Sequence, residues 1–391
     1  MRILLVIYGS LDTLSGGYLY DRTLVRHLES RGHAVRVYSQ RRKAPYPANI
    51  FDNADASLVD EAAAWKPDFI LEDELNHPSL FLLNHRLRRA ARAPLIGIVH
   101  HLKSLEEGGV LERATARWIE RRFLGSLDGF VFNSSFTRRS VEEALRADSG
   151  DGRAAAALKR SVIALPGKDR LSPVHEPAPA PVPAPVPEST TERRGRGNRL
   201  RLLFLGNVIR RKGLHVLIQA LSPLSGTSRS CTLAVAGDEG IDEDYTASVK
   251  MAIRKAGMEE RVHWLGSVAD ADLPRIFQEH DLLAVPSQCE GFGIVYAEAM
   301  SYGLPVIAGT LGGAAEIIDA GKDGFLVRWE DAPALAALLA ALADHPERLG
   351  ELADHARKKA ATLPTWNDSM ERIEEFLAAF PRGGENDTEA T

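Results

Sequence analysis

The chain has 391 residues, 45% hydrophobic and 26% charged, with a formal net charge of −5, which is typical of a soluble protein with two domains of ordinary size. Its apolar first segment is too short for a signal peptide, and no run approaches the roughly 18 apolar residues of a membrane span, so we expect a cytoplasmic protein. Two cysteines without a Cys/His cluster argue against a disulfide framework or a structural metal, and nothing indicates a nucleic-acid partner.

The chain opens with a strand–helix–strand pattern. Strands are predicted at Ile3–Ile7 and Val35–Tyr38, on either side of a helix at Tyr18–Arg31. The loop before that helix ends in Gly16 and Gly17. Adjacent glycines let a backbone approach a ligand closely, although turn geometry alone also explains glycines in such loops.

Two more strands are predicted at Asp68–Leu71 and Leu95–Val99, and the second runs directly into His100 and His101. A side chain at the carboxyl end of a parallel strand lies at the edge where such sheets bind ligands. Either a ligand contact or a structural histidine, hydrogen-bonded within its loop, fits this position.

The next segment is a predicted helix, Glu112–Leu124, with Trp118, Ile119 and Phe123 on its inward face. Basic residues gather in this helix and in the segment before it: Arg86, Arg88, Arg89, Arg92, Arg113, Arg117, Arg121 and Arg122. They fit either solvated helix faces or peripheral contact with an anionic membrane surface or an anionic acceptor.

The first half closes with strands at Gly129–Phe132 and Ser161–Leu165, and Ser134 or Ser135 is a suitable cap for the helix between them. A proline-rich stretch, 172–198, then marks a domain boundary. Its Pro-Ala and Pro-Val repeats favour an extended polyproline spacer over a docking motif.

The second half repeats the alternation of strands and helices, which predicts another parallel α/β sheet. Its strands are expected at Leu200–Leu205, Thr232–Ala236, Val262–Leu265, Leu282–Val285, Val306–Ala308 and Gly324–Val327. Its helices are expected at Leu214–Leu221, Tyr245–Ala256, Ala271–Gln278 and Pro333–Ala343, with a further helix after the last of these.

The rest of the chain is organised around the loop and helix that follow Leu282–Val285. The loop carries Glu290 and Gly293, a helix starts near Ile294, and Glu298 lies inside it. A helix start of this kind presents free N–H groups to a phosphate, and carboxylates accept hydrogen bonds from paired sugar hydroxyls. The pattern therefore favours a ligand such as a nucleotide sugar, although an ordinary turn with a solvated Glu298 also fits.

Three motifs in this half resemble the donor-site signature of retaining glycosyltransferases of family 4, the glycogen-synthase-like group 1 enzymes. They are Glu290-Gly-Phe-Gly293 with Glu298, Gly303-Leu-Pro-Val-Ile-Ala308 and Gly312-Gly-Ala-Ala-Glu316. The resemblance covers nearly the whole chain and implies the GT-B fold, an α/β architecture in which two Rossmann-like domains face each other across a cleft.

The resemblance also implies a domain organisation in which the last helix crosses back to the first domain. We expect a first, acceptor-binding domain at 1–171 that includes the helix 366–380, a linker at 172–198, a donor-binding domain at 199–365 and a frayed tail at 381–391.

Family roles transfer to the matching positions. In the family, the Gly-Gly loop reaches the donor diphosphate, the histidine contacts the donor sugar, and a basic pair binds the diphosphate. Lys212 matches that pair, but Asn207 stands where the family usually has arginine, so Arg210 or Arg211 would substitute. The expected donor-binding residues are Gly16, Gly17, Asn207, Arg211, Lys212, Val268, Glu290, Gly291, Phe292, Gly293, Ile294 and Glu298, and the expected catalytic ones are His100, Lys212 and Glu290.

The implied reaction is transfer of a hexosyl unit from a UDP-, GDP- or ADP-sugar to a hydroxyl acceptor, with retention and without a cofactor. The motifs do not identify the acceptor, which could be a sugar, a lipid-linked group or a small molecule. Asp270-Ala-Asp272 is expected to cap a helix and Asp242-Glu-Asp244 to be solvated, so no metal is expected. A nucleotide-sugar epimerase, a sugar phosphorylase and a non-catalytic binder are the alternatives with this fold.

Overall fold

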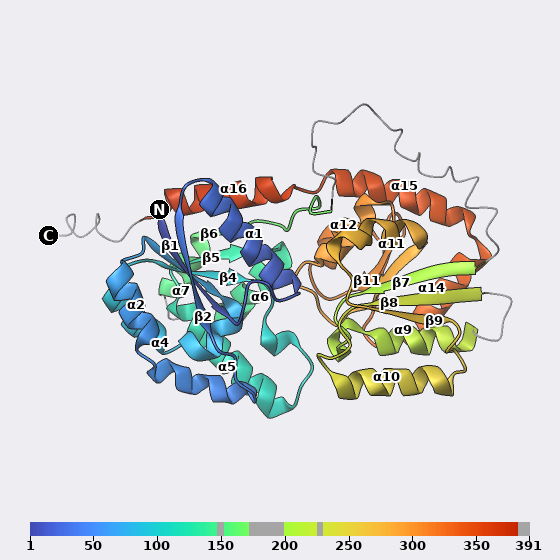
Figure 1. Ribbon diagram of the computed structural model, residues 1–391, viewed down its shortest axis with the longest axis horizontal. Helices are drawn as coiled ribbons and strands as arrows, with labels where there is room; N and C mark the ends of the chain where they lie inside the picture. The colour runs from blue at the N-terminus through green and yellow to red at the C-terminus, as the bar shows by residue number, and fades with distance from the viewer. Residues whose placement is uncertain (147–151, 172–198, 225–229, 382–391) are drawn as a thin grey trace. The chain divides into compact units, whose positions relative to one another are not determined.

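The computed structural model describes residues 1–146, 152–171, 199–224 and 230–381. The expected linker at 172–198 and all but the first residue of the expected tail lie outside these ranges. Two compact units are present, the first made of Met1–Gly167 with the segment from Pro364 onward, the second of Lys168–Leu363. Each unit is built on one parallel sheet (Figure 1).

The first unit has a six-stranded parallel sheet in the order β2-β1-β3-β4-β5-β6. Its strands are β1 (Arg2–Tyr8), β2 (Ala34–Gln40), β3 (Phe69–Asp73), β4 (Leu95–Val99), β5 (Gly129–Phe132) and β6 (Ser161–Ile163). The inner strands are buried on both faces, which explains their almost unbroken apolar runs.

Helices cover both faces of this sheet. They are α1 (Gly16–Ser30), α2 (Ser57–Trp65), α3 (His77–Leu80), α4 (Leu83–Ala91), α5 (Val110–Ser126), α6 (Ser135–Arg146), α7 (Gly152–Lys159) and α16 (Trp366–Ala379). Figure 1 shows α16, at the red end of the chain, lying along α1. Among these helices, α2, α3, α4 and α7 were not predicted.

The C-terminal helix α16 is fixed to the first unit by both charge and packing. Glu374 accepts hydrogen bonds from His27 and His33, each at 3.0 Å. The ring of Phe380, at the end of the helix, meets Phe69 of β3 edge-on at 6.1 Å. A capping box at Thr365 and Asp368 starts the helix.

Two local expectations in the first unit have opposite outcomes. Ser134 caps α6, because its Oγ accepts the Thr137 N–H at 3.0 Å, as predicted. On α5, Ile119 and Phe123 are buried, but Trp118 is 51% exposed, so its predicted inward position is wrong. Arg122 lies over the Trp118 ring at 4.6 Å, a cation–π contact that a surface position allows.

The second unit has its own parallel sheet, in the order β12-β11-β10-β7-β8-β9. The strands are β7 (Arg199–Leu205), β8 (Ser230–Ala236), β9 (Val262–Gly266), β10 (Leu282–Val285), β11 (Val306–Gly309) and β12 (Gly324–Val327). The helices are α9 (Leu214–Leu221), α10 (Glu243–Lys255), α11 (Leu273–Glu279), α12 (Ile294–Ser301), α13 (Ala314–Ile317), α14 (Ala332–Asp344) and α15 (Glu347–Ala361). The predicted pair of parallel α/β sheets is confirmed.

The first unit ends at Gly167 rather than at 171, four residues earlier than expected. Residues 168–171 belong to the second unit because their side chains and backbone bond to it. Arg170 pairs with Glu298 and Asp270, and the Tyr302 hydroxyl donates to the Leu171 carbonyl at 2.7 Å. No helix in the described ranges is long and apolar enough to cross a membrane.

Candidate functional site

The strand order of the second sheet reverses between β10 and β7, and the loops that follow these two strands meet there. Such a switch point is where open α/β sheets bind ligands. The Lys212 ammonium, from the loop after β7, donates to the Glu290 carboxylate, from the loop after β10, at 2.6 Å. Arg211 lies 3.8 Å from the other Glu290 oxygen, and Ser287 donates to the first at 2.8 Å.

This group, Arg211, Lys212 and Glu290, carries two positive charges and one negative charge, and we call it the cation cluster. Burial alone would raise the pKa of Glu290, but Lys212 and Arg211 outweigh burial and lower that pKa to about 2. Burial lowers the pKa of Lys212, and the attraction of Glu290 offsets part of that effect. Glu290 is therefore ionised at neutral pH and the cluster has an excess of positive charge.

Glycines allow the loops of the cation cluster to touch. Gly213 has φ +77°, and a Cβ there would lie 2.2 Å from the Pro286 carbonyl oxygen. Gly312 has φ +126°, and a Cβ there would lie 2.1 Å from the Glu290 carbonyl oxygen. The glycines of the recognised motifs are thus required by close backbone contacts around Glu290.

Helix α12 begins directly after this loop. Phe292 is buried, and Gly293 is the N-cap residue with φ +96° and no side-chain hydrogen bond to the helix. The first N–H groups of α12, from Ile294 onward, therefore have no side-chain cap, and the positive end of the helix dipole lies there. Gly291 is also in close contact with the Gly312–Gly313 segment. A Cβ on Gly313 would lie 2.4 Å from the carbonyl oxygen of Gly291.

Glu298 is in α12 but not in the cation cluster. It is fully buried, and Arg170 binds both of its oxygens, through Nε at 2.6 Å and Nη2 at 3.0 Å. Burial raises the pKa of Glu298, and Arg170 partly offsets that rise. Sequence reasoning missed Arg170. It lies 128 residues before Glu298, and no motif in the sequence connects the two.

The two Asp-x-Asp candidates also differ from expectation. Asp272 stands at the N-cap of α11 but makes no side-chain hydrogen bond there, and Asp270 pairs with Arg170, so the predicted cap is wrong. Asp242 is not simply solvated, because its carboxylate caps α10 by accepting the Tyr245 N–H at 3.1 Å.

Of the other expected donor residues, Arg211 lies in the cation cluster, but Asn207 and Val268 have no contact with it in the described residues. Two arginines were expected to replace the family residue at Asn207. Arg211 lies 3.8 Å from Glu290, whereas Arg210 pairs with exposed Glu330 at 2.7 Å. Asn207 follows Gly206 in a loop that bonds to the one after β8. Val268 is half-buried after β9, and no contact places it in the cation cluster.

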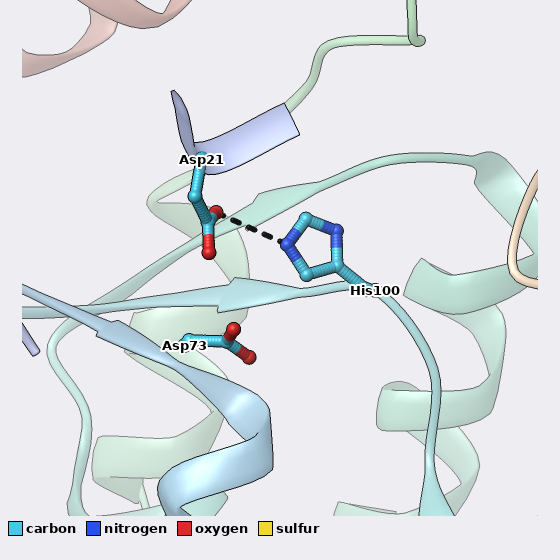
Figure 2. A group of neighbouring side chains, drawn as sticks. All are labelled: Asp21, Asp73 and His100. Carbon is cyan, nitrogen blue, oxygen red and sulfur yellow. Dashed lines mark hydrogen bonds and ion pairs between the residues drawn. The ribbon is translucent and has the colours of Figure 1, made fainter. Parts of the chain in front are cut away.

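In the first unit, the order reverses between β1 and β3, and His100 directly follows the next strand, β4. Its backbone N–H donates to Glu74 at 2.9 Å, and its carbonyl accepts from Asn133 at 3.0 Å. Its ring Nε2 lies 3.2 Å from Asp21 Oδ1. Figure 2 marks this contact with a dashed line. His100 is thus a fixed side chain, only 9% exposed.

The glycine pair of the first unit is helical rather than part of a loop. Ser15 caps α1, which begins at Gly16, two residues earlier than predicted. A Cβ on Gly17 would lie 3.3 Å from Cδ2 of His100. The structure therefore brings Gly17 and His100 together, and close approach to this ring explains the glycine.

Buried acids surround His100. Asp21, Asp73 and His100 each offer a potential metal-ligand atom, and these atoms lie within 4.8 Å of one another. Burial, together with the charges of Asp21 and Glu74, raises the pKa of Asp73 well above its usual value. Burial also raises the pKa of Glu74 to about 7, against the opposing effect of His100.

Comparison with known proteins agrees with this geometry. The chain matches the family described as Glycosyltransferase Family 4 over residues 19–152 and the family described as Glycosyl transferases group 1 over residues 188–361. It is 27% identical to D-inositol 3-phosphate glycosyltransferase of Corynebacterium urealyticum, in an alignment covering 71% of this chain and 62% of that protein. It is 24% identical to MMP alpha-(1->4)-mannosyltransferase of Mycolicibacterium hassiacum, covering 94% and 95% of the two chains.

The fold has close solved neighbours. The structure of Anabaena HepE in complex with UDP and glucose superposes with a TM-score of 0.71, at 21% identity, over 97% of this chain and 100% of that one. Family matches in both units, two parallel sheets and this superposition agree, so the chain belongs to the group 1 glycosyltransferases with the GT-B fold.

Proposed function

We propose that the protein transfers a hexosyl unit from a nucleoside diphosphate sugar to a hydroxyl acceptor, with retention of anomeric configuration and without a required metal ion. The observation that carries the proposal is the cation cluster at the switch point of the second sheet, next to the start of α12. Its excess positive charge and the uncapped N–H groups suit a diphosphate.

Departure of the diphosphate is the step that this site would accelerate. Negative charge grows on the leaving oxygens, and fixed donors that face this charge lower the barrier. Lys212 has three N–H donors and gives one to Glu290, so further donors remain for phosphate oxygens. Because Glu290 is buried and Lys212 is half-buried, they interact strongly and hold their geometry as the charge moves.

Glu290 and His100 are proposed to contact the transferred sugar. Glu290 keeps its negative charge at neutral pH, which suits an acceptor of hydrogen bonds from sugar hydroxyls. His100 is held by its backbone and by Asp21, so its ring has a defined orientation. Neither residue is proposed as a covalent nucleophile.

Glu298 is proposed to bind the ribose hydroxyls of the donor. Because Arg170 takes both oxygens at present, the ribose would have to use the remaining lone pairs or displace the guanidinium. Arg170 then has a role of its own, since it stabilises the ionised form of a fully buried carboxylate.

The relatives support a nucleotide-sugar donor. Anabaena HepE has been solved with UDP and with UDP-glucose. The aligned part of this chain spans 62% of the corynebacterial relative and 95% of the mycolicibacterial one. Donor and acceptor are therefore to be found by experiment rather than transferred from either protein.

The decisive experiment is a thermal-shift screen of UDP, GDP, ADP and their sugars, followed by turnover of the donor that binds. A ligand that binds only the folded state raises Tm, by mass action. Release of the nucleoside diphosphate, with an α-linked product from an α-linked donor by NMR, supports the proposal. Conversion of the donor to its epimer, or binding without turnover, would replace it with one of the alternatives.

We also propose that the protein works at a membrane surface on the cytoplasmic side. At the start of α5, Val110 and Leu111 are 76% and 84% exposed, with Arg113 and Arg117 on the same helix also exposed. Exposed apolar groups beside basic ones favour anionic lipid. Co-sedimentation with phosphatidylglycerol vesicles, lost in Leu111→Glu, tests this, and equal binding to neutral vesicles contradicts it.

A further inference from the structure

The three side chains in Figure 2 leave two buried oxygens without a partner. Asp21 and Asp73 are both 0% exposed. Asp21 Oδ1 bonds to His100, and Asp73 Oδ1 accepts the Leu75 N–H at 2.9 Å. The second oxygen of each carboxyl group has no hydrogen-bond partner when protons on carboxyl groups are left out. A buried acceptor without a donor is costly, so each oxygen requires an explanation.

Asp21 and Asp73 each have a carboxylate oxygen within 4.8 Å of the other's. A proton on the Asp73 carboxyl group, donated to Asp21, would give each of the two oxygens a partner. Two ionised carboxylates this deep and this close would repel each other and would both lack water. Burial is the largest cause of the raised pKa of Asp73. The charges of Asp21 and Glu74 and a hydrogen bond to Asp21 raise that pKa further.

The charge distribution places that proton on Asp73 rather than on Asp21. Asp21 faces the His100 ring. Burial lowers the pKa of His100, but Asp21, through its charge and its hydrogen bond, together with the Glu74 charge outweighs burial and raises it. The other groups around the ring are the Glu74 carboxylate, which accepts the His100 N–H, and the Tyr20 ring, edge-on at 5.1 Å. The charged partner of His100 is therefore Asp21.

We propose that Asp21 and Asp73 share one proton and act together as positioning residues for His100, with Asp21 holding ring Nε2 and leaving Nδ1 for a hydroxyl of the donor sugar. This inference rests on the proposed role of His100. It assigns Asp73 as a neutral acid, a hydrogen-bond donor that keeps Asp21 aimed at the ring. A divalent cation in place of the proton is the competing explanation, since two carboxylates and an imidazole also suit a metal.

The experiment uses three variants of the full chain. Asp73→Leu removes the hydrogen-bond donor, and turnover should fall at least about tenfold, the size of loss seen when the partner of a metal-bound histidine is removed. Asp73→Asn keeps an N–H donor towards Asp21 and should recover most of that loss. Asp21→Asn removes the charge and should lower kcat about 10- to 100-fold, with nucleoside diphosphate affinity unchanged. Asp60→Asn, an exposed site on α2, is the matched control.

A spectroscopic readout separates positioning from a merely structural role. In protein labelled with ¹⁵N-histidine, the His100 nitrogens should report a proton on Nε2 in the wild type and in Asp73→Asn. They should change in Asp21→Asn. This signal does not require a sugar donor, so it tests the inference even if no nucleotide sugar binds and the proposed function is wrong. If Asp21→Asn does not fold, the spectra of the wild type and Asp73→Asn still test the inference.

Two results would overturn the inference. One is a stoichiometric metal in the purified wild type by mass spectrometry, lost in both Asp73→Asn and Asp21→Asn, which would make the cluster a cation site. The other is an unchanged His100 spectrum in folded Asp21→Asn, which would show that Asp21 does not position the ring. Addition of Zn²⁺ or Mn²⁺ should leave the wild-type spectrum unchanged.

Discussion

The two sheets end in regions of opposite electrostatic character. Beside β7 and β10, Lys212 and Arg211 flank the single carboxylate of Glu290. Beside β3 and β4, the carboxyl groups of Asp21, Asp73 and Glu74 surround the single ring of His100. The same type of sheet edge thus carries excess positive charge in the second unit and excess acid in the first.

Under the proposed function, this difference assigns different parts of the donor to the two regions. An anion such as a diphosphate is attracted to the second region and is not attracted to the first, where the Asp21 carboxylate lies beside His100. The first region suits an uncharged, hydroxyl-bearing group that exchanges hydrogen bonds. Variants at the two regions should therefore separate binding of the nucleotide from handling of the sugar.

The largest effect is expected at Lys212. Lys212→Ala removes a donor to the leaving diphosphate, so kcat/KM should fall roughly 10²- to 10³-fold. Nucleoside diphosphate affinity should fall with it, because the diphosphate is present before and after transfer. Turnover assays and calorimetry check both, with exposed Lys255→Ala on α10 as the control.

His100→Ala is the counterpart of this variant in the first unit. It should lower turnover while nucleoside diphosphate affinity stays at the wild-type value. Equal loss of nucleotide affinity in the two variants would break the comparison, since it would mean that both regions serve the diphosphate.

The second expected effect is a stability change in acid. The pKa of Glu290 is about 2 in the folded state and about 4.5 when the chain is unfolded. The ionised carboxylate therefore contributes stability that is fully present above pH 4.5 and is lost as the pH falls towards 2. Its size is about 3 kcal/mol. Urea unfolding of Glu290→Gln and wild type should show a difference that shrinks as the pH is lowered from 6.

Glu72 in the first unit should behave in the opposite sense. Burial raises its pKa to about 8, and the Asn84 hydrogen bond offsets only part of this. Stability from the neutral acid is fully present below pH 4.5 and is lost as the pH rises towards 8. Glu72→Gln should thus become more stable relative to wild type between pH 5 and 8. A parallel pH dependence for the two variants would contradict the contrast between the regions.

The third effect concerns Glu298. Loss of charge-assisted hydrogen bonds to ribose costs on the order of 1.5–3 kcal/mol, so Glu298→Ala should weaken nucleoside diphosphate binding roughly tenfold to a hundredfold. Arg170→Met leaves Glu298 buried without its partner and should lower stability more than the double variant Arg170→Met/Glu298→Gln does. Unchanged nucleotide affinity in folded Glu298→Ala would falsify the ribose assignment.

The smallest effect is expected from metal removal. The cation cluster and the start of α12 already offer positive charge to a diphosphate, and Asp270 is paired with Arg170. Turnover in excess EDTA should therefore fall by no more than about twofold. A protein that is silent in EDTA and restored by Mn²⁺ or Mg²⁺ would require a different account of the second region.

Most of the fold could be predicted because buried parallel strands are continuous apolar runs bounded by turn residues. The bounds of β4, β5, β10 and β12 match the prediction to the residue. The prediction that Trp118 faces inward was wrong. Its helical spacing suggests burial, but Arg122 on the same helix covers its ring at the surface. Short helices such as α2 and α4 carry weaker patterns.

The candidate site was only partly predictable, because motifs identify residues but not their partners. Lys212, Glu290 and Glu298 lie in recognisable motifs. Arg170 lies 128 residues from Glu298, and Asp21 lies 79 residues from His100, with no local pattern to connect either pair. These two partners decide the charge and orientation of the predicted residues, so the chemistry depends on tertiary contacts that the motifs do not contain.

The placement of α16 has a consequence for synthesis on the ribosome. Domains generally fold as units during translation, with the N-terminal one first. Here the helix that covers α1 and supplies Glu374 to His27 and His33 is made only after the whole second unit. The first unit must therefore wait as an incomplete fold, with those histidines and Phe69 lacking their contacts from α16, until the last part of the chain emerges.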